Sequence, residues 1–549
     1  MAKIFNKIAM IFATPVLTRD YFSKKTGSEY GIGLWNKIIL FIKFRKNIKR
    51  VSCASSFLEH LKMATAILNI PKNLEGVVVE CGAYKGGSTV NLSLLCSACG
   101  RRLKVFDSFE GLPDPEQEDK AHLVFGSREI HAYSKGAFKG VLEEVKENVK
   151  KYGDLSVCDF YKGYFKDTMP QFKEKCVFVF EDADLKESIE DCLKNLWPLL
   201  GDGCYFYTHE AQHLETASLF FDNEWWNKNL NSKAPGLVGA GNGLGISVDG
   251  DFFGGSTGYA IKNPEKSSFT EKPQDSQLLV SIITPTFNRG EFLEKNILSI
   301  KNQNYKNIEH IVTDGGSTDN SLDILKKYEG TYNLKWVSEK DNGCANAMNK
   351  GFKMASGDIF CWLDADDYYL PGTLEKVVKI FQNNPNVDVV FGDIFVCNAN
   401  GKIIDFIRHT DFSADTAIYE GMNVSTQAIF WRKKVHNMLD QLDEKYLRCA
   451  DYDFFVRMGL LGVKFFHSRD FLSVYRHHKG QISRSVKLRQ SEEKTIVEKY
   501  KDRNLSRFGL RLKKVQALLR RGLHLIKQGD IYYVLRGILR RTGIIKKYE

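Results

Sequence analysis

The sequence predicts two consecutive α/β domains, each built around a doubly wound sheet with helices between its strands. Three observations support this fold class. The chain has 549 residues, which is too many for one ordinary hydrophobic core. Short apolar runs alternate with helical patterns in two separate series along the chain. The polar, proline-containing stretch 263–277 lies between the two series and is typical of a linker.

The composition excludes several classes of protein. The net charge is +11, and residues 501–549 hold 14 basic and 3 acidic residues, so this segment alone carries the whole excess. A nearly neutral remainder is not typical of a nucleic-acid-binding protein, and we expect no nucleic-acid partner. Twelve scattered Cys suit a reducing compartment such as the cytoplasm. No apolar run reaches the length of a membrane-spanning helix.

Residues 1–70 form a basic lead-in that is rich in apolar residues. An apolar stretch at 8–17 follows two lysines and resembles a short signal peptide. Pro15 interrupts it and no clear small-residue cleavage site follows, so we expect it to be retained. Residues 35–46 predict an amphipathic helix, which lies either on the surface or against the next domain.

The first α/β domain is expected at 71–262 and opens with a buried strand at 77–80. A glycine-rich turn at 81–89 and a helical pattern follow this strand. A strand, a glycine-rich turn and a helix allow the backbone to approach a nucleotide-like ligand closely, although glycines required by packing are the alternative. The next strand, 103–107, ends in Asp107, where a carboxylate is placed to bind a ribose.

Two later strands of this domain also end in polar residues. Asp182 follows a strand at 177–180, and His209 and Glu210 follow a strand at 204–207. Because the carboxyl ends of parallel strands meet at one edge of a sheet, these side chains are expected to lie together. Carboxylate and imidazole ligands at one edge are plausible for a divalent cation, and simple capping of the strand ends is the alternative.

Four ordered blocks of the first domain resemble the macrocin O-methyltransferase family (TylF/MycF type), over roughly 75–262. These enzymes use S-adenosylmethionine and act on sugar hydroxyls. The matching blocks are VECGAYKGGS at 79–88, FDSFEGLP at 106–113, GYFKDTMP at 163–170 and DADLKES at 182–188. The resemblance implies a Rossmann-like methyltransferase fold with S-adenosylmethionine at Glu80, Gly82, Gly86, Ser88, Asp107 and Ser108, and Mg²⁺ near Asp182. His209 and Glu210 could also ligate this metal or act as a base.

One departure from this family concerns the later strand end. The family usually has two adjacent Asp there, whereas this chain has Thr208, His209 and Glu210. Two hypotheses therefore stay open. The domain is an active methyltransferase, or it is a non-catalytic docking or glycan-binding module that retains the fold.

The second α/β domain is expected at 278–490 and has the strongest acidic pattern. Its predicted strands are 278–284, 308–313, 334–338 and 359–363, and polar or acidic turns follow each of them. Asp364, Asp366 and Asp367 follow the last strand. Clustered carboxylates are costly to bury unless a cation joins them, and oxygen ligands suit Mg²⁺ or Mn²⁺. An exposed acidic turn is the alternative.

Five ordered blocks of this domain resemble the family 2 glycosyltransferases of the GT-A fold. They are SIITPTFNR at 281–289, VTDGGSTD at 312–319, SEKDNG at 338–343, AMNKG at 347–351 and LDADD at 363–367. The resemblance implies a nucleotide-sugar donor and inversion at the anomeric carbon. The implied donor-binding residues are Thr284, Pro285, Thr286, Asn288, Arg289, Asp314, Glu339, Asp341, Asp364 and Asp366.

The same resemblance implies the metal ligands and the base. A divalent ion is expected on Asp364 and Asp366, with His478 from a loop that closes over the donor; an ordinary surface His is the alternative for His478. Asp451 matches the family's catalytic base, although Ala450 stands where a Glu is usual. A carboxylate is suited to take the proton of the acceptor hydroxyl.

The last segment, 491–549, is expected to form a basic amphipathic helical tail. Such helices favour anionic membrane surfaces, and a solvated helical appendage is the alternative. Taken together, the sequence predicts a bifunctional enzyme of surface-polysaccharide assembly that acts on a glycan or a lipid-linked glycan. It is expected in the cytoplasm, peripherally on the inner face of the cell membrane.

Overall fold

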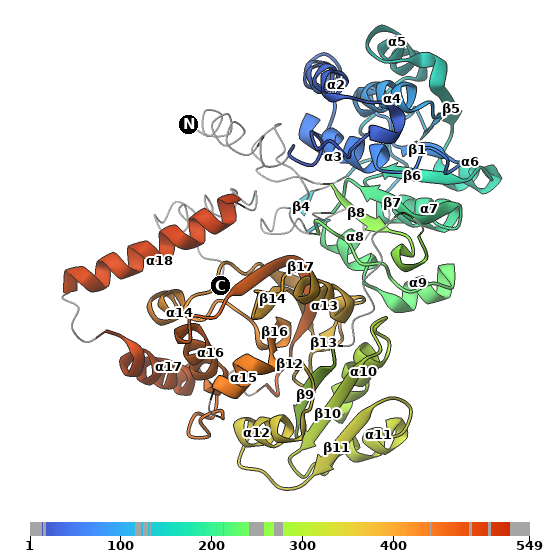
Figure 1. Ribbon diagram of the computed structural model, residues 1–549. Helices are drawn as coiled ribbons and strands as arrows, with labels where there is room; N and C mark the ends of the chain where they lie inside the picture. The colour runs from blue at the N-terminus through green and yellow to red at the C-terminus, as the bar shows by residue number, and fades with distance from the viewer. Residues whose placement is uncertain are drawn as a thin grey trace. The chain divides into compact units, whose positions relative to one another are not determined.

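The computed structural model shows two compact units, which are described separately (Figure 1). The first comprises the described residues up to 269 together with 525–527, and the second those from 278 to 524. The described residues are 14, 18–115, 122–123, 130–131, 133–211, 213–240, 257–267, 269, 278–439, 441–481, 486–502 and 507–527. The signal-like stretch, most of the predicted linker and the end of the predicted tail lie outside these ranges.

A six-stranded sheet forms the middle of the first unit. Its order is β5-β2-β1-β6-β7-β8, and neighbouring strands are parallel except for the pair β7 and β8. The strands predicted from the sequence are β1, β2, β6 and β7, which confirms the α/β fold. The strands are β1 (Val77–Cys81), β2 (Leu103–Asp107), β5 (Cys158–Lys162), β6 (Cys176–Glu181), β7 (Leu200–Thr208) and β8 (Gly258–Ile261); a separate pair is β3 (His122–Leu123) and β4 (Ile130–His131).

The order of the strands creates a crevice beside β1. The chain adds β2 and β5 on one side of β1 and then crosses to add β6 and β7 on the other. Ligands of such sheets bind where the strand order reverses, outside the carboxyl ends of the strands. Gly82 follows β1 and Asp182 follows β6, so both lie at this point.

Helices of the first unit begin at local sequence signals. Ser56 and Glu59 form a reciprocal capping box at the start of α3, because each side chain accepts a hydrogen bond from the other's backbone N–H. Helices α2, α3 and α5 all pack on α4. The helices are α2 (Leu34–Asn47), α3 (Phe57–Leu68), α4 (Gly87–Cys99), α5 (Leu142–Tyr152), α6 (Phe165–Thr168), α7 (Lys186–Leu196), α8 (Leu214–Leu219) and α9 (Asn223–Leu230), with the short 3-10 helices η1 (Ser28–Tyr30), η3 (Leu155–Val157), η4 (Met169–Gln171) and η5 (Pro264–Lys266).

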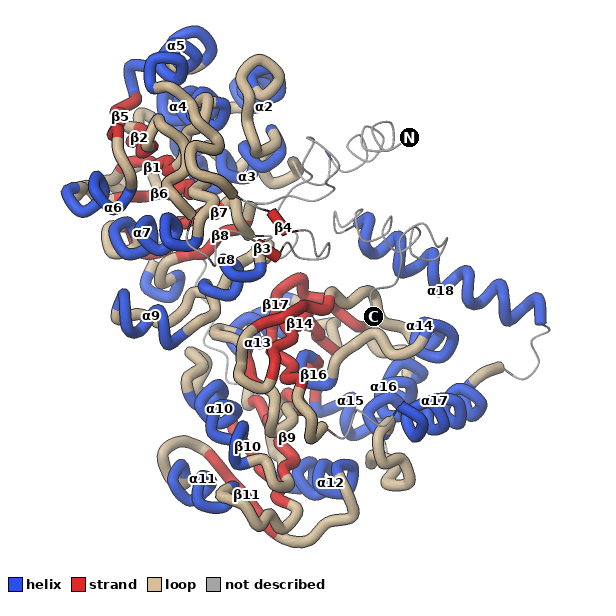
Figure 2. The backbone as a smooth tube through the Cα atoms, turned by 180° about the vertical axis from the view of Figure 1, so that it is seen from behind, coloured by secondary structure: helices blue, strands red, loops and turns tan. Residues whose placement is uncertain are grey.

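A larger sheet forms the middle of the second unit (Figure 2). Strands β11, β10, β9 and β12 are adjacent and parallel, which confirms the four predicted strands. The sheet then continues through β16, β14, β17 and β13 with mixed directions, a part that the sequence did not predict. The strands are β9 (Val280–Thr286), β10 (Ile308–Asp314), β11 (Leu334–Ser338), β12 (Ile359–Trp362), β13 (Tyr368–Tyr369), β14 (Val389–Asn398), β15 (Ile403–Ile407), β16 (Ile429–Arg432) and β17 (Phe465–His477).

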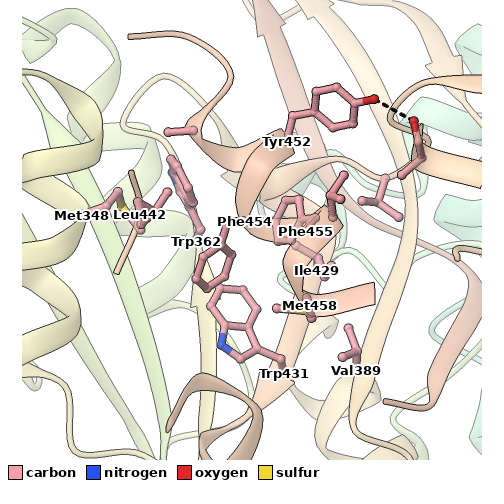
Figure 3. Packing of buried hydrophobic residues seen from close by; sticks show 14 of the residues in the cluster. Met348, Trp362, Val389, Ile429, Trp431, Leu442, Tyr452, Phe454, Phe455 and Met458 are labelled. Carbon is pink, nitrogen blue, oxygen red and sulfur yellow. Dashed lines mark hydrogen bonds between the residues drawn. The ribbon is translucent and has the colours of Figure 1, made fainter. Parts of the chain in front are cut away.

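A buried aromatic cluster joins helix α16 to this sheet (Figure 3). Phe454 and Phe455 of the helix pack with Trp431 of β16, and Tyr452 donates a hydrogen bond of 2.7 Å to the carbonyl of Ala417. Burial of each such ring contributes about 1.5–3 kcal/mol. The first turn of α16, which carries Asp451, is therefore held rigidly on the sheet.

The helices of the second unit lie between and beyond these strands. They are α10 (Gly290–Lys301), α11 (Ser321–Tyr328), α12 (Cys344–Met354), α13 (Thr373–Asn383), α14 (Ala414–Glu420), α15 (Lys433–Met438), α16 (Ala450–Leu460), α17 (Val486–Tyr500) and α18 (Arg507–Lys527), with the 3-10 helix η6 (Thr426–Ala428). Within the described part of the chain, no helix has both the length and the apolar character that a bilayer span requires.

Helix α17 is tied to α16 by buried polar contacts. Asp453 is fully buried and accepts hydrogen bonds from Arg457 (2.8 Å), Lys499 (2.9 Å) and the hydroxyl of Tyr500 (2.8 Å). Ile496 of α17 is also buried in the aromatic cluster. The domain boundary predicted at residue 490 therefore falls inside a helix that packs on the second unit.

Candidate active sites

The acidic turn after β12 brings carboxylates together as the sequence predicts. The indole Nε1 of Trp362 donates to Asp364 Oδ1 at 2.8 Å. Burial, and then the charge of Asp366, raises the pKa of Asp364 to about 7. Asp367 differs, since its Oδ1 accepts from the backbone N–H of Arg476 at 2.8 Å and so holds the turn in place. A cation between Asp364 and Asp366 would offset their mutual repulsion, so these residues fit a divalent metal.

The loop after β17 reaches this turn. His478 Nε2 lies 2.9 Å from Asp366 Oδ2, so the structure brings together the two residues predicted to share a metal. Arg289 Nε lies 3.9 Å from the same oxygen, and its Nη2 donates to the carbonyl of Gly480 at 2.8 Å. Arg289 thereby links the loop after β9 to the loop that carries His478.

Other predicted donor-binding residues stabilise the loops around the site. Asp314 accepts from the backbone N–H groups of Gly316 (3.0 Å) and Ser317 (2.9 Å) and from the hydroxyl of Ser338 (2.6 Å). Asn288 Oδ1 accepts from the backbone N–H of Thr318 at 2.8 Å. Both side chains fix the turns after β9 and β10.

Four more predicted donor-binding residues lie either within β9 or on the surface. Thr284 is fully buried, and its hydroxyl lies 2.9 Å from His310 Nε2, while Pro285 lies within β9. Thr286 is also buried, but its hydroxyl has no hydrogen-bond partner among the described residues. Glu339 is exposed and pairs with Lys350 at 2.8 Å.

Cys344, which sequence reasoning missed, is affected by the charges of several predicted carboxylates. It is the first residue of α12, beside Asp341, which accepts from the N–H of Gly343 at 2.9 Å. Burial raises the pKa of the Cys344 thiol well above its usual range, and the charges of four Asp add to this rise. These four are Asp364, Asp451, Asp341 and Asp366. The candidate base and the candidate metal ligands, which come from three different segments, therefore all act electrostatically on this thiol.

Asp451 lies in the first turn of α16, and burial raises its pKa to about 6. A second residue that the sequence did not reveal holds the segment before it. Both carboxylate oxygens of Glu492, from α17, accept hydrogen bonds of 3.0 Å from the backbone N–H groups of Leu447, Arg448 and Cys449. Glu492 therefore fixes the approach to the base.

The first unit contains a cavity of about 670 Å³ at the carboxyl ends of β1 and β6. This size is typical of a ligand-binding pocket. Six predicted residues line it: Gly82, Asp107, Ser108, Asp182, His209 and Glu210. Three of the predicted cofactor-binding residues and the three predicted metal-binding residues of this unit therefore line the same cavity.

Gly82 and Asp107 shape the floor of this cavity. A Cβ at Gly82 would lie 1.9 Å from the carbonyl oxygen of Asp182, and its φ is +88°, so packing alone requires glycine here. Asp107 accepts from the backbone N–H groups of Ala83 (2.6 Å), Tyr84 (3.2 Å) and Phe109 (2.6 Å). This carboxylate holds the glycine-rich turn in shape.

Three other predicted cofactor residues do not line the cavity. Glu80 is fully buried, its oxygens have no hydrogen bond to a described residue, and burial raises its pKa to about 8. Gly86 precedes α4 with φ +85°, and Ser88 is buried in the first turn of that helix. None of the three is among the residues that line the cavity.

A candidate metal centre lies in the wall of the cavity. One ligand atom each from Asp182, His209 and Glu210 lies within 4.8 Å of the others. His209 Nδ1 is 3.2 Å from Asp182 Oδ1 and 3.7 Å from Glu210 Oε1. Burial lowers the pKa of His209, but the charge of Asp182 and hydrogen bonds to both carboxylates outweigh it, so the pKa stands well above its usual range. The nitrogen and oxygen ligands fit a divalent cation that would replace this proton.

Two further acids beside this centre were not predicted. Burial and then the charge of Glu210 raise the pKa of Glu181 well above its usual range. Burial and then the charge of Asp182 raise the pKa of Asp184 to about 7. Asp184 also has a left-handed backbone, with φ +61°, which directs the chain after β6. The acidic character of the site is therefore stronger than the motif alone indicates.

Comparison with known proteins identifies both units. Residues 281–440 match the family described as Glycosyl transferase family 2. An uncharacterized glycosyltransferase of Methanocaldococcus jannaschii is 30% identical over 212 residues, which cover 36% of this chain and 70% of that protein. This chain belongs to the family 2 glycosyltransferases. A PGL/p-HBAD biosynthesis glycosyltransferase of Mycobacterium bovis is 31% identical over 182 residues, covering 33% of this glycosyltransferase and 69% of that protein.

The first unit of this glycosyltransferase has a family likeness of its own. Residues 54–231 match the family described as Macrocin-O-methyltransferase (TylF). The O-methyltransferase NovP is 22% identical, with 38% of this chain and 80% of that chain covered and a TM-score of 0.29. By its two family matches, the enzyme combines a family 2 glycosyltransferase domain with a macrocin O-methyltransferase-like domain.

Solved glycosyltransferase structures also match part of this chain, at low sequence identity. S. aureus TarS 1–349 in complex with UDP-GlcNAc is 18% identical, with 50% of this chain and 94% of that chain covered and a TM-score of 0.34. For a longer TarS structure, which is 20% identical with a TM-score of 0.35, the match covers 45% of this chain and 44% of that chain.

Proposed function

We propose that this enzyme transfers a sugar from a nucleotide-sugar donor to a glycan or a lipid-linked glycan, and that its first unit methylates a sugar hydroxyl with S-adenosylmethionine. The observation that carries the first activity is the contact of His478 and Arg289 with Asp366, at the acidic turn that also holds Asp364, in a family 2 glycosyltransferase unit. A role in surface-polysaccharide assembly follows as part of this proposal.

Charge determines the chemistry of sugar transfer. Asp364, Asp366 and His478 would hold Mg²⁺ or Mn²⁺, and His478 Nε2 already lies within hydrogen-bond distance of Asp366. Such an ion, when bound, offsets the negative charge that develops on the leaving nucleoside diphosphate. Arg289, which lies beside Asp366, adds a positive charge next to the same group.

Asp451 takes the proton of the acceptor hydroxyl in this proposal. With a pKa raised to about 6, its carboxylate is ionised at neutral pH and is a stronger base than an ordinary Asp. The hydroxyl oxygen then bonds to the anomeric carbon while the bond to the diphosphate oxygen breaks on the opposite face. Direct displacement of this kind inverts the anomeric centre.

A hydrolysis screen of nucleotide sugars with the full chain tests this function. We expect at least one nucleotide sugar to be hydrolysed in the presence of Mg²⁺ or Mn²⁺, with the rate lost on addition of a chelator. Hydrolysis that persists in the chelator would refute the metal dependence, and a complete absence of turnover with every donor and acceptor tested would refute sugar transfer.

The methyltransferase proposal rests on the cavity that Gly82, Asp107 and the Asp182 centre share. We expect titration of S-adenosylmethionine into the full chain to give saturable binding, and Mg²⁺ to bind separately through Asp182, His209 and Glu210. Asp182→Asn is expected to weaken Mg²⁺ binding about 10–100-fold while S-adenosylmethionine still binds. An absence of cofactor binding, with or without Mg²⁺, would favour the docking-module hypothesis instead.

The tail is proposed to contact an anionic membrane surface, which would place the enzyme peripherally on the cytoplasmic face. On α18, Leu512, Val515, Leu519 and Leu523 are exposed and recur at helical spacing. Deletion of residues 507–549 is expected to weaken binding to anionic vesicles in a sedimentation assay without loss of donor hydrolysis. Unchanged vesicle binding would contradict this role.

A further inference from the structure

Helix α2 has an inner face that is firmly anchored in the first unit. Lys37, Leu40, Phe44 and Asn47 of this helix are buried. The side chain of Asn47 donates to Asn91 Oδ1 of α4 at 2.9 Å, and the buried Lys37 ammonium donates to the carbonyl of Ser23 at 2.7 Å. The helix is therefore a fixed part of the unit, and its orientation on the unit is defined.

The outer face of α2 is apolar and exposed. Trp35 is 77% exposed, Ile39 50% and Ile42 45%. Because successive residues of an α-helix are turned by about 100°, these three side chains lie within about 60° of one another around the axis. Exposed apolar side chains that gather on one stripe mark an interaction site more often than isolated ones do.

Basic side chains border this apolar stripe on both sides. Lys43 and Arg45 are exposed and fall about 80° to either side of Trp35 around the helix axis. Lys46 is exposed at the end of the stripe, and Lys49 and Arg50 are exposed just beyond the helix. Residues 30–50 include no Asp or Glu, so nothing within this segment neutralises these charges.

We propose that the outer face of α2, defined by Trp35, Ile39, Ile42 and the five basic residues beside them, is a binding site for an anionic lipid bilayer. The apolar stripe would enter the boundary between headgroups and acyl chains, where Trp is favoured. The flanking Lys and Arg reach anionic headgroups from both sides. No residue of α2 lines the cavity of the first unit, so this surface is separate from the proposed methylation site.

A lipid bilayer fits this face better than a folded protein partner does. The charges are of one sign and lie along both edges of the apolar stripe, so they suit a plane of uniform negative charge. They are also distinct from the charges of α18, which belongs to a different part of the chain. The proposal deepens the membrane association proposed above and predicts that the tail is not the sole contact.

Vesicle sedimentation with four proteins tests the proposal. These are the full chain, the chain without residues 507–549, and both again with Trp35→Ser, Ile39→Ser and Ile42→Ser. The probes are vesicles of phosphatidylcholine with and without phosphatidylglycerol. In the tail-deleted background we expect binding to the anionic vesicles to remain, and the triple substitution to reduce it at least about tenfold.

Two controls separate lost contact from lost structure. Ile404→Ser, Ile407→Ser and Leu460→Ser remove three side chains of comparable exposure from the second unit and are expected to leave vesicle binding unchanged. Trp35→Phe is expected to retain binding but to lose the part of the fluorescence blue shift that Trp35 contributes on addition of vesicles. Melting temperatures of all variants verify that they fold.

Several outcomes would overturn the proposal. These are equal vesicle binding by the triple variant and its parent, an absence of anionic binding in the tail-deleted chain, and a change of oligomeric state in the triple variant without a change in vesicle binding. The last result would identify the face as a protein interface. Donor hydrolysis, measured in solution on the same proteins, tests sugar transfer independently of the lipid result.

Discussion

Replacement of Asp364 by Asn is expected to reduce metal-dependent sugar transfer and donor hydrolysis about 10³-fold. The substitution removes one of two carboxylates that hold the proposed cation, and the Lewis-acid contribution of such an ion is several kcal/mol, with each 1.4 kcal/mol equal to a factor of ten. The measurement is kcat/KM for donor hydrolysis over a range of Mn²⁺ concentrations. Asp323→Asn, which alters an exposed carboxylate of α11, is the matched control and should keep full activity.

The stability of the Asp364→Asn protein distinguishes loss of the metal from loss of the fold. Because burial raises the pKa of Asp364 to about 7, the folded state binds a proton that the unfolded state releases near pH 4. The stability that this carboxyl contributes is therefore lost as the pH rises through about 7. At pH 8 without metal, the variant should melt at or above the temperature of the parent. Full activity of the variant, or a large fall in its melting temperature, would contradict the assignment.

Replacement of Asp451 by Asn is expected to lower kcat about 10²–10⁴-fold, the usual contribution of a general base, with donor affinity retained. Donor affinity is measured by titration calorimetry with a non-hydrolysable donor. The amide keeps the acceptor oxygen that receives the N–H of Tyr452, so the first turn of α16 should stay in place. A strong loss of donor affinity would indicate that Asp451 binds the donor rather than the acceptor hydroxyl.

The pH profile gives a second test of the same residue. Burial raises the pKa of Asp451 to about 6, and a base is active only when deprotonated. The kcat/KM of the parent should therefore fall as the pH decreases through about 6. The residual activity of Asp451→Asn should lack this acidic limb, and an unchanged limb would assign it to another group.

The strands that could be predicted are those marked by a short pattern of neighbouring residues. Each of β9, β10, β11 and β12 is a short apolar run followed by a polar turn, and this signal depends on neighbours in the sequence. The acids that follow these strands could be expected at one sheet edge, because parallel strands place their carboxyl ends together. The short apolar runs of β1, β2, β6 and β7 gave the sheet of the first unit in the same way.

Contacts between distant segments account for what the sequence did not reveal. Glu492 accepts hydrogen bonds from residues 447–449, and His478 reaches Asp366 from 112 positions further along the chain. Gly82 shows a different limit. Glycine is expected at this position both in a nucleotide-binding turn and where the backbone packs closely against Asp182, so the sequence does not separate these two reasons. The backbone geometry shows that the close contact with Asp182 by itself requires glycine. Strands β16, β14, β17 and β13 were not predicted, because the sequence in this part does not alternate regularly between strand and helix patterns.

The anchoring of α17 sets the point at which the chain can be divided. A protein that ended at residue 490 would remove the hydrogen bonds of Lys499 and Tyr500 to Asp453 and leave Arg457 as its partner, and each hydrogen bond to a charged group contributes about 1.5–3 kcal/mol. It would also remove Glu492 and so free the segment that leads to Asp451. The exchangeable module of sugar transfer thus ends after Tyr500. A tail grafted from another enzyme, or a tag fused in its place, preserves the base if it is joined beyond that residue.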